Sequence, residues 1–131
     1  MRVSTLFKEY IEIQKQYEQM GKPLPLAIQH EYESKMFIEN LWRTLIKYAD
    51  GGAIPKAGWE WVDNVCEKNI FSDISQELRA DLEIGIDEVR CFRKVILSKP
   101  ELLIDGHTLS KEGRKRLRKT CDIIGMLHCK S

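Results

Sequence analysis

The chain has 131 residues, of which 43% are hydrophobic and 31% are charged, and its formal net charge is +1. This size and composition predict one folded domain, residues 1–131, and exclude a disordered chain. No apolar run approaches the roughly 18 residues that indicate a membrane span, and the first apolar stretch is too short for a signal peptide, so we expect a cytoplasmic protein that does not contact membranes.

The N-terminal part of the chain predicts two helices. Ser4 or Thr5 can cap the first helix, and Gly21 can end it in the left-handed conformation. The second helix starts near Pro25 and continues without glycine or proline to about Ala49. Apolar residues of the first helix recur at alternating spacings of 4 and 3 residues and form one stripe: Leu6, Tyr10, Ile13, Tyr17 and Met20.

The middle of the chain predicts a short helix and then a long one. The stretch after residue 50 is irregular, and we expect a loop followed by a short helix that ends near residue 69. The long helix begins after Asp73 or Ser75 and stops at Lys99-Pro100. Its apolar positions follow a heptad-like pattern that suits packing against other long helices, and Gly85 on this face marks a close helix crossing.

The last predicted helix begins at Ser110, a good N-cap residue, and has a basic outer face. Projection at about 100° per residue places apolar positions on one side, with Arg116 at their edge. The basic residues that avoid this side are Lys111, Arg114, Lys115, Arg118 and Lys119. These helices together predict an all-α fold: an antiparallel helical bundle of four main helices plus one short helix.

One short segment between the last two helices departs from the helical pattern. The sequence ELLIDGHTL can form a small hairpin, because Asp-Gly is a turn dipeptide. A hairpin next to a basic helix is also found in winged-helix proteins. No convincing recognition helix precedes the segment, so the bundle is the preferred interpretation.

Charge is unevenly distributed along the chain. Residues 1–49 carry a net charge of +1, residues 50–105 carry −5, and residues 106–131 carry +5. The basic helix has three interpretations: a solvated face paired with the acidic middle of the chain, a docking surface for an acidic protein, or a surface that binds nucleic-acid phosphates. It lacks interleaved aromatic residues, which argues against base stacking.

Two tryptophans of the short helix form the second candidate surface. Trp59 and Trp61 cannot point in the same direction, so one can enter the core while the other stays at the surface. Tryptophan is enriched at binding hot spots because it buries a large area and keeps a hydrogen-bond donor. The alternative is that both rings close one end of the bundle.

The sequence offers little reactive chemistry. It contains no glycine-rich phosphate loop, and His30 starts an incomplete HExxH motif whose second histidine is replaced by Ser34, so we expect His30 to be an ordinary surface residue. Cys121, His128 and Cys129 are poorly spaced for zinc. We therefore expect no metal, no cofactor, no catalytic residues and free cysteines.

These observations favour a function that depends on binding. We expect a small non-enzymatic regulator, inhibitor or adaptor that acts by binding a surface of a larger protein or protein complex. The alternative is a nucleic-acid-binding accessory protein that uses the basic C-terminal helix. The candidate partner-binding residues are Trp59, Trp61, Lys111, Arg114, Lys115, Arg118 and Lys119. Small helical chains of this kind are frequent in phages and mobile elements, which is an association and not a physical argument.

Overall fold

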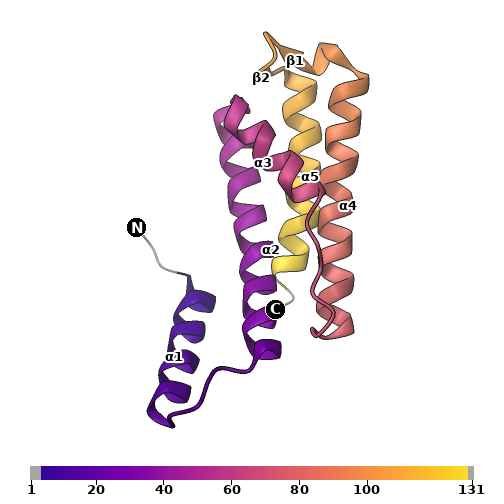
Figure 1. The fold of residues 1–131 in the computed structure, drawn as a ribbon. Coiled ribbons are helices and arrows are strands. Elements are labelled where there is room, and N and C mark those ends of the chain that lie inside the picture. The colour runs from indigo at the N-terminus through magenta and orange to yellow at the C-terminus, as the bar shows by residue number, and fades with distance from the viewer. Residues whose placement is uncertain (1–3, 130–131) are drawn as a thin grey trace.

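The computed structural model describes residues 4–129, and helices make up most of this part of the chain (Figure 1). The helices are α1 (Thr5–Gln19), α2 (Leu26–Gly51), α3 (Lys56–Cys66), α4 (Gln76–Ser98) and α5 (Lys111–Cys129). A 3-10 turn (Pro100–Leu102) and the strands β1 (Leu103–Ile104) and β2 (Thr108–Leu109) join α4 to α5. The predicted all-α fold is confirmed.

The starts of three helices follow the predicted capping chemistry. The hydroxyl oxygens of Ser4, Ser75 and Ser110 each accept a hydrogen bond from the backbone N–H three residues later, at 3.0, 3.2 and 3.1 Å. Each bond satisfies one of the N–H groups that the first turn of a helix leaves unpaired. The predicted hairpin also forms, with Asp105 and Gly106 at positive φ in its turn.

The bundle is built from α2, α4 and α5. Helix α5 packs against both other helices and runs antiparallel to them, whereas α2 and α4 run parallel to each other (Figure 1). The core at the hairpin end of the bundle joins all three helices with α3, while a second cluster fills the opposite end. Central side chains of the first core are Leu41, Leu45, Val89, Phe92, Leu117 and Ile124.

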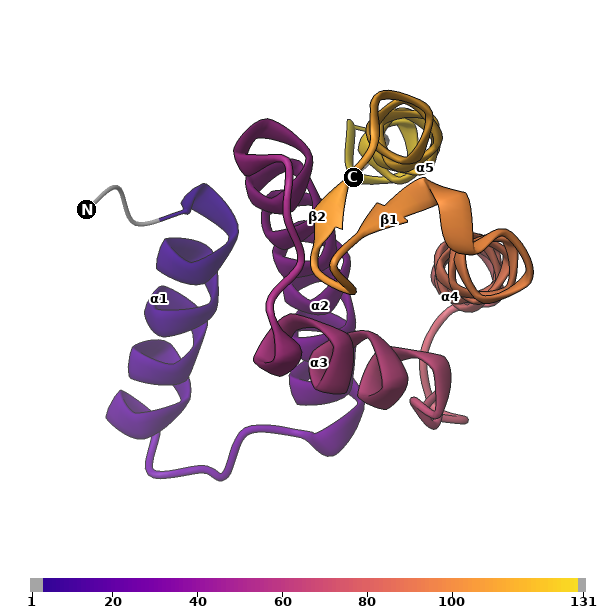
Figure 2. The ribbon, with the colours of Figure 1, turned by 90° about the horizontal axis from the view of Figure 1, so that it is seen from above.

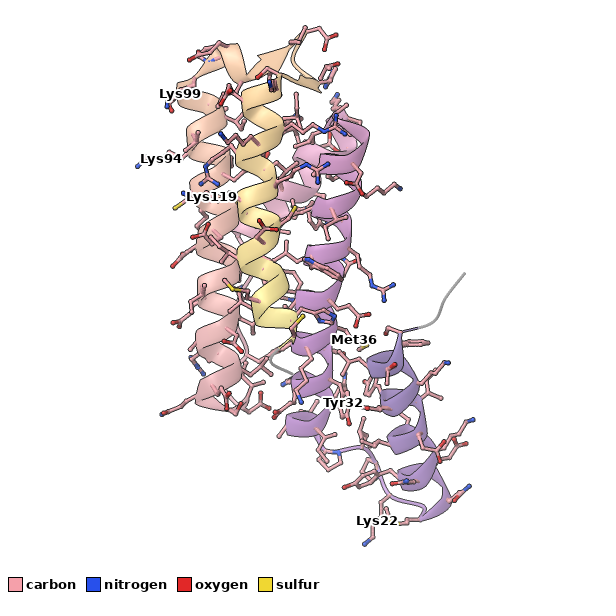
Figure 3. All side chains as sticks on the ribbon, turned by 180° about the vertical axis from the view of Figure 1, so that it is seen from behind. Lys22, Tyr32, Met36, Lys94, Lys99 and Lys119 are labelled. Atoms are coloured by element: carbon pink, nitrogen blue, oxygen red, sulfur yellow. The ribbon has the colours of Figure 1, made fainter. Side chains whose placement is uncertain are left out.

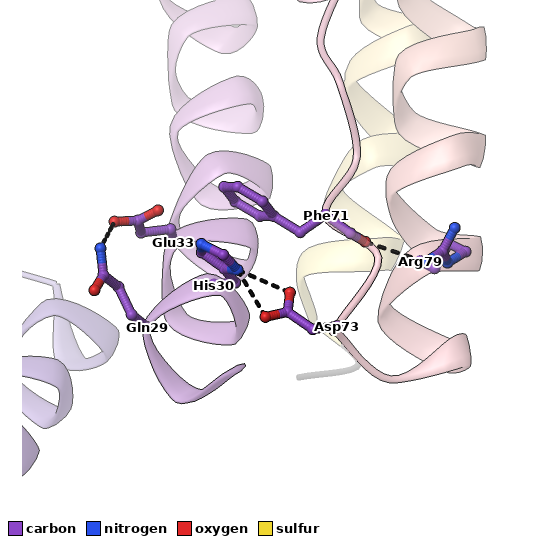
Figure 4. A network of polar contacts seen from close by, with 6 residues as sticks. All are labelled: Gln29, His30, Glu33, Phe71, Asp73 and Arg79. Carbon is purple, nitrogen blue, oxygen red and sulfur yellow. Dashed lines mark hydrogen bonds and ion pairs between the residues drawn. The ribbon is translucent and has the colours of Figure 1, made fainter. Parts of the chain in front are cut away.

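Two parallel helices need a long connection, which α3 and residues 67–75 supply. Helix α3 lies across the hairpin end, and the chain then returns to the opposite end, where α4 begins (Figures 1 and 2). His30 of α2 holds this returning segment, since its ring stacks on Phe71 at 3.8 Å and its Nδ1 lies 2.8 and 3.0 Å from the carboxylate oxygens of Asp73 (Figure 4). His30 is therefore half-buried and structural, which differs from the expected surface residue.

Helix α1 stands outside the bundle and packs on the N-terminal part of α2 (Figures 1 and 2). The rings of Tyr10 and Tyr32 stack at 5.4 Å, and Tyr10 is the buried residue of α1. Phe7 and Met20 remain exposed. The predicted stripe thus packs mainly on α2. None of the helices in residues 4–129 combines the length and apolar character needed to cross a membrane.

Arginines from neighbouring helices bind the ends of α2 and α3. Neither helix has a basic residue in its own last turn. Arg114 of α5 donates to the carbonyl oxygens of Ala49, at 2.7 Å, and Asp50, while Arg90 of α4 donates to that of Cys66 at 2.9 and 2.7 Å. The last carbonyls of a helix lack partners within the helix and attract positive charge, so these contacts fix the two ends.

We predict that Arg114→Ala lowers the free energy of unfolding by about 1.5–3 kcal/mol, the usual contribution of hydrogen bonds that involve a charged group. Urea-induced unfolding followed by circular dichroism measures this change. Lys115→Ala, next in the helix and exposed, is the matched control and should change stability by no more than about 0.5 kcal/mol. Equal losses in both variants would contradict a role for the carbonyl contacts.

Glycines at two helix contacts differ in the space around them. A Cβ atom added to Gly113 would overlap the backbone carbonyl oxygen of Leu102. A Cβ added to Gly85 would meet Leu127 and Leu41 at 3.6 and 3.7 Å, which are ordinary van der Waals distances. Gly85 does face other helices, as predicted, but this crossing leaves room for a methyl group.

We predict opposite effects for the two Gly→Ala variants. Gly85→Ala should raise the midpoint of thermal unfolding, because alanine favours the helix by up to about 1 kcal/mol and fits the available space. Gly113→Ala should lower it, since the backbone of the 3-10 turn must shift. Calorimetry distinguishes the two, and a stabilised Gly113→Ala variant would show that α5 does not approach the turn this closely.

Candidate functional site

A hollow of about 290 Å³ opens beside Trp59, where α3, α4 and the hairpin meet. It is called the Trp59 hollow here, and its lining residues are Trp59, Asp63, Arg93, Ile96, Leu97, Leu103 and Gly106. Pro55 directly precedes α3 and thereby positions Trp59 in its first turns. The Trp59 ring stacks on Phe92 of α4 at 6.2 Å with an interplanar angle of 4°, so one face of the indole is covered.

The hairpin forms one side of the hollow, and its turn is held in shape by Asp105. The carboxylate accepts hydrogen bonds from the backbone N–H groups of His107 and Thr108 at 3.3 and 3.2 Å, and these bonds lower the pKa of Asp105. Gly106 in this turn lines the hollow. Ile104, at the end of β1, is 57% exposed.

Two charged side chains, Asp63 of α3 and Arg93 of α4, line the hollow beside its apolar residues. Arg93 forms an ion pair with Asp63 at 3.0 Å, which joins α4 to α3 at the edge of the hollow. A second, shallower hollow on the outer surface of α4 shares Arg93 and Leu97 and adds Arg90, Lys94 and Ser98. Leu97 is 70% exposed. The site therefore combines an indole edge and exposed aliphatic side chains with guanidinium and ammonium groups.

The two predicted tryptophans occupy different environments. Trp59 borders the hollow, whereas Trp61 packs edge-on against Tyr48 of α2, with ring centroids 6.2 Å apart. Both side chains are half-buried and pack against the core. The structure thus places Trp61 in the α2–α3 contact and leaves Trp59 as the tryptophan that borders an open surface.

The predicted basic residues of α5 separate into two groups. Arg114 is bound to the carbonyls at the end of α2, and Arg118 forms an ion pair with Asp50 at 3.2 Å. Both arginines therefore hold α5 against α2. The other predicted residues are exposed and form no ion pair with another described residue: Lys111, Lys115 and Lys119. The structure does not bring these lysines into the Trp59 hollow.

The suspected zinc residues are dispersed among packing contacts. Among residues 4–129, no group of three or more His, Cys, Asp or Glu side chains is placed to hold a metal ion. The His128 ring stacks on Trp42 at 5.3 Å, and the Cys121 thiol is buried, which raises its pKa to about 11. All four cysteines are free.

Sequence reasoning did not identify Arg93 and Leu97 as site residues. Leu97 lies off the predicted core face of its helix, and a solvent-facing leucine in that position was the available signal. The ion pair of Arg93 with Asp63 joins α4 to α3, which are separated in sequence by the returning segment. Helical periodicity does not predict contacts between two helices and therefore could not identify this pair.

No protein-family model, curated protein or solved structure matches this chain. The functional argument therefore depends on the chemistry of the surface itself.

We predict that stability falls as pH rises from about 9 toward 11. In the unfolded chain Cys121 loses its proton near its ordinary pKa of 9.0, whereas the folded protein holds the proton until about 11. The unfolded state is therefore favoured progressively across this range. Urea unfolding at a series of pH values measures the slope, which should become shallower in Cys121→Ala. Cys91→Ala removes an exposed thiol instead and should keep the original slope.

Proposed function

We propose that this chain is a small non-enzymatic regulator, inhibitor or adaptor that binds a larger protein through the Trp59 hollow and the adjoining surface of α4. The observation that carries the proposal is the combination of Trp59, Leu97 and Arg93 at one hollow. Tryptophan and arginine are enriched at binding hot spots, and a hollow lets a partner side chain become fully desolvated. The proposal places the protein in the cytoplasm, where thiols stay reduced.

Exposed apolar side chains add support for this surface. Leu97 is 70% exposed and lines the hollow, and Ile104, which is 57% exposed, follows the lining residue Leu103 on the hairpin. Burying such side chains against a partner recovers about 25 cal/mol for each Å² of apolar area removed from water. Neighbouring apolar side chains at a hollow therefore favour a protein partner.

The nucleic-acid alternative has lost part of its support. Of the five basic residues predicted on α5, Arg114 and Arg118 are engaged with the end of α2. The exposed lysines can still neutralise phosphates, so nucleic acid stays the competing proposal.

The proposal is tested by placing a photo-crosslinking amino acid at position 97 of the full chain in its native host. We expect crosslinks to one discrete protein. The matched control is position 126 on α5, because Met126 is also a large exposed apolar residue, at 62%. Crosslinks to nucleic acid, equal labelling from both positions, or no labelled protein from position 97 would overturn the proposal.

A further inference from the structure

The antiparallel pairing of α4 and α5 brings positive charge together at one end of the bundle. Along α4 and its C-cap Lys99, residues 76–88 hold five acidic residues and one basic residue, whereas residues 89–99 hold four basic and no acidic residues. In α5, residues 111–119 hold six basic residues and one acidic residue. Because the helices run in opposite directions, the two basic segments meet at the hairpin end (Figure 1). These two segments are called the basic end.

Contacts across the helices confirm this placement. Lys99, which directly follows α4, and Lys111 and Arg116 of α5 line one hollow between the helices, together with the carboxylates of Glu101 and Glu112. Figure 3 shows Lys94, Lys99 and Lys119 at the hairpin end of the molecule. The acidic segment of α4 lies at the opposite end, beside the C-terminal part of α5, where Leu78 and Leu127 belong to one core cluster. The acidic middle of the chain therefore does not neutralise the basic helix as a whole.

Part of the positive charge is used within the fold. Arg90, Arg93 and Arg118 form ion pairs with Asp87, Asp63 and Asp50. Five ammonium groups at the basic end are exposed and form no ion pair with another described residue: those of Lys94, Lys99, Lys111, Lys115 and Lys119. Like charges concentrated on one surface repel each other and attract anionic partners, which they also steer during association.

The basic end and the Trp59 hollow are continuous along α4. Lys94 and Leu97 line the same shallow hollow, and Leu97 also lines the Trp59 hollow. A phosphate backbone would satisfy the lysines but would leave Leu97 and the indole edge without apolar contacts. A polypeptide can satisfy both, because one chain carries apolar and carboxylate side chains at adjacent positions.

We infer that the partner presents an acidic segment with an apolar anchor: a large apolar side chain occupies the Trp59 hollow, and flanking Asp or Glu carboxylates meet Lys94 and Lys99. This inference rests on the proposed function, since it names the chemistry of the partner at the same surface. The apolar anchor supplies the buried contact, and the carboxylates supply orientation and the rate of association.

Fluorescence anisotropy with synthetic peptides tests the inference on the purified full chain. The probe is a labelled peptide with one leucine-tryptophan anchor between glutamate-rich flanks. We expect it to bind, whereas the same peptide with lysine flanks, or with serines in place of the anchor, should bind at least about tenfold more weakly. Equal binding of the glutamate and lysine peptides, or no binding of the glutamate peptide, would overturn the inference.

Protein variants assign the binding to this surface. Lys94→Glu with Lys99→Glu should weaken binding of the acidic peptide roughly tenfold or more, because two attractive charges become repulsive. Lys8→Glu with Lys15→Glu on α1 makes the same charge change at exposed positions away from the site and should have little effect. Leu97→Ser tests the anchor, and because Leu97 is exposed the substitution should leave the fold intact. Equal losses in both charge variants would show that only net charge matters.

A duplex DNA of arbitrary sequence distinguishes the competing partner class. Contact with about four phosphates gives a slope of log affinity against log salt near −3.6. Tight DNA binding with such a slope and no effect of Leu97→Ser would overturn the inference in favour of phosphate binding. If position 97 crosslinks to a protein but the acidic peptide does not bind, only the inferred partner chemistry is wrong. If the peptide binds but no protein is crosslinked, the proposed function is wrong.

Discussion

The contact between Arg114 and the end of α2 fixes the geometry on which the rest of the bundle depends. The last carbonyls of α2, a helix of 26 residues, have no partners within the helix, and its last turn carries no basic residue. The Arg114 guanidinium supplies both the hydrogen-bond donors and the positive charge. Gly52 follows with a positive φ, a backbone conformation that favours glycine. The contact fixes where the first turns of α5 lie along α2. The hairpin pairs with the residues that directly follow α2.

Local chemistry made much of the fold predictable. Serine caps, the glycine after the first helix and the Asp-Gly turn act within a few residues, so the sequence carries their signals directly. Apolar periodicity likewise identified the face of α4 that carries Leu82, Val89 and Phe92. Periodicity does not reveal the direction of one helix relative to another, so it could not predict that α2 and α4 run parallel.

Polar side chains were harder to predict than apolar ones. His30 looked like a surface residue, because the ring of Phe71 and the carboxylate of Asp73 that bury and bind it arrive from a segment some forty residues later in the chain. Arg114 also looked like part of a solvated face, because periodicity does not show that an arginine can pack its aliphatic stem against a neighbouring helix and still reach backbone oxygens. The candidate site was predictable only through Trp59, since its other walls come from α4 and the hairpin.

The peripheral position of α1 has a consequence for how the molecule opens. A helix that contacts mainly one neighbour, with a single buried residue, requires less free energy to detach than the three-helix core requires to unfold. From this packing we expect amide hydrogens of α1 to exchange with solvent through local opening and those of α5 to exchange only through global unfolding. Detachment would also uncover Tyr32 on α2, whose ring stacks on Tyr10 in the folded protein.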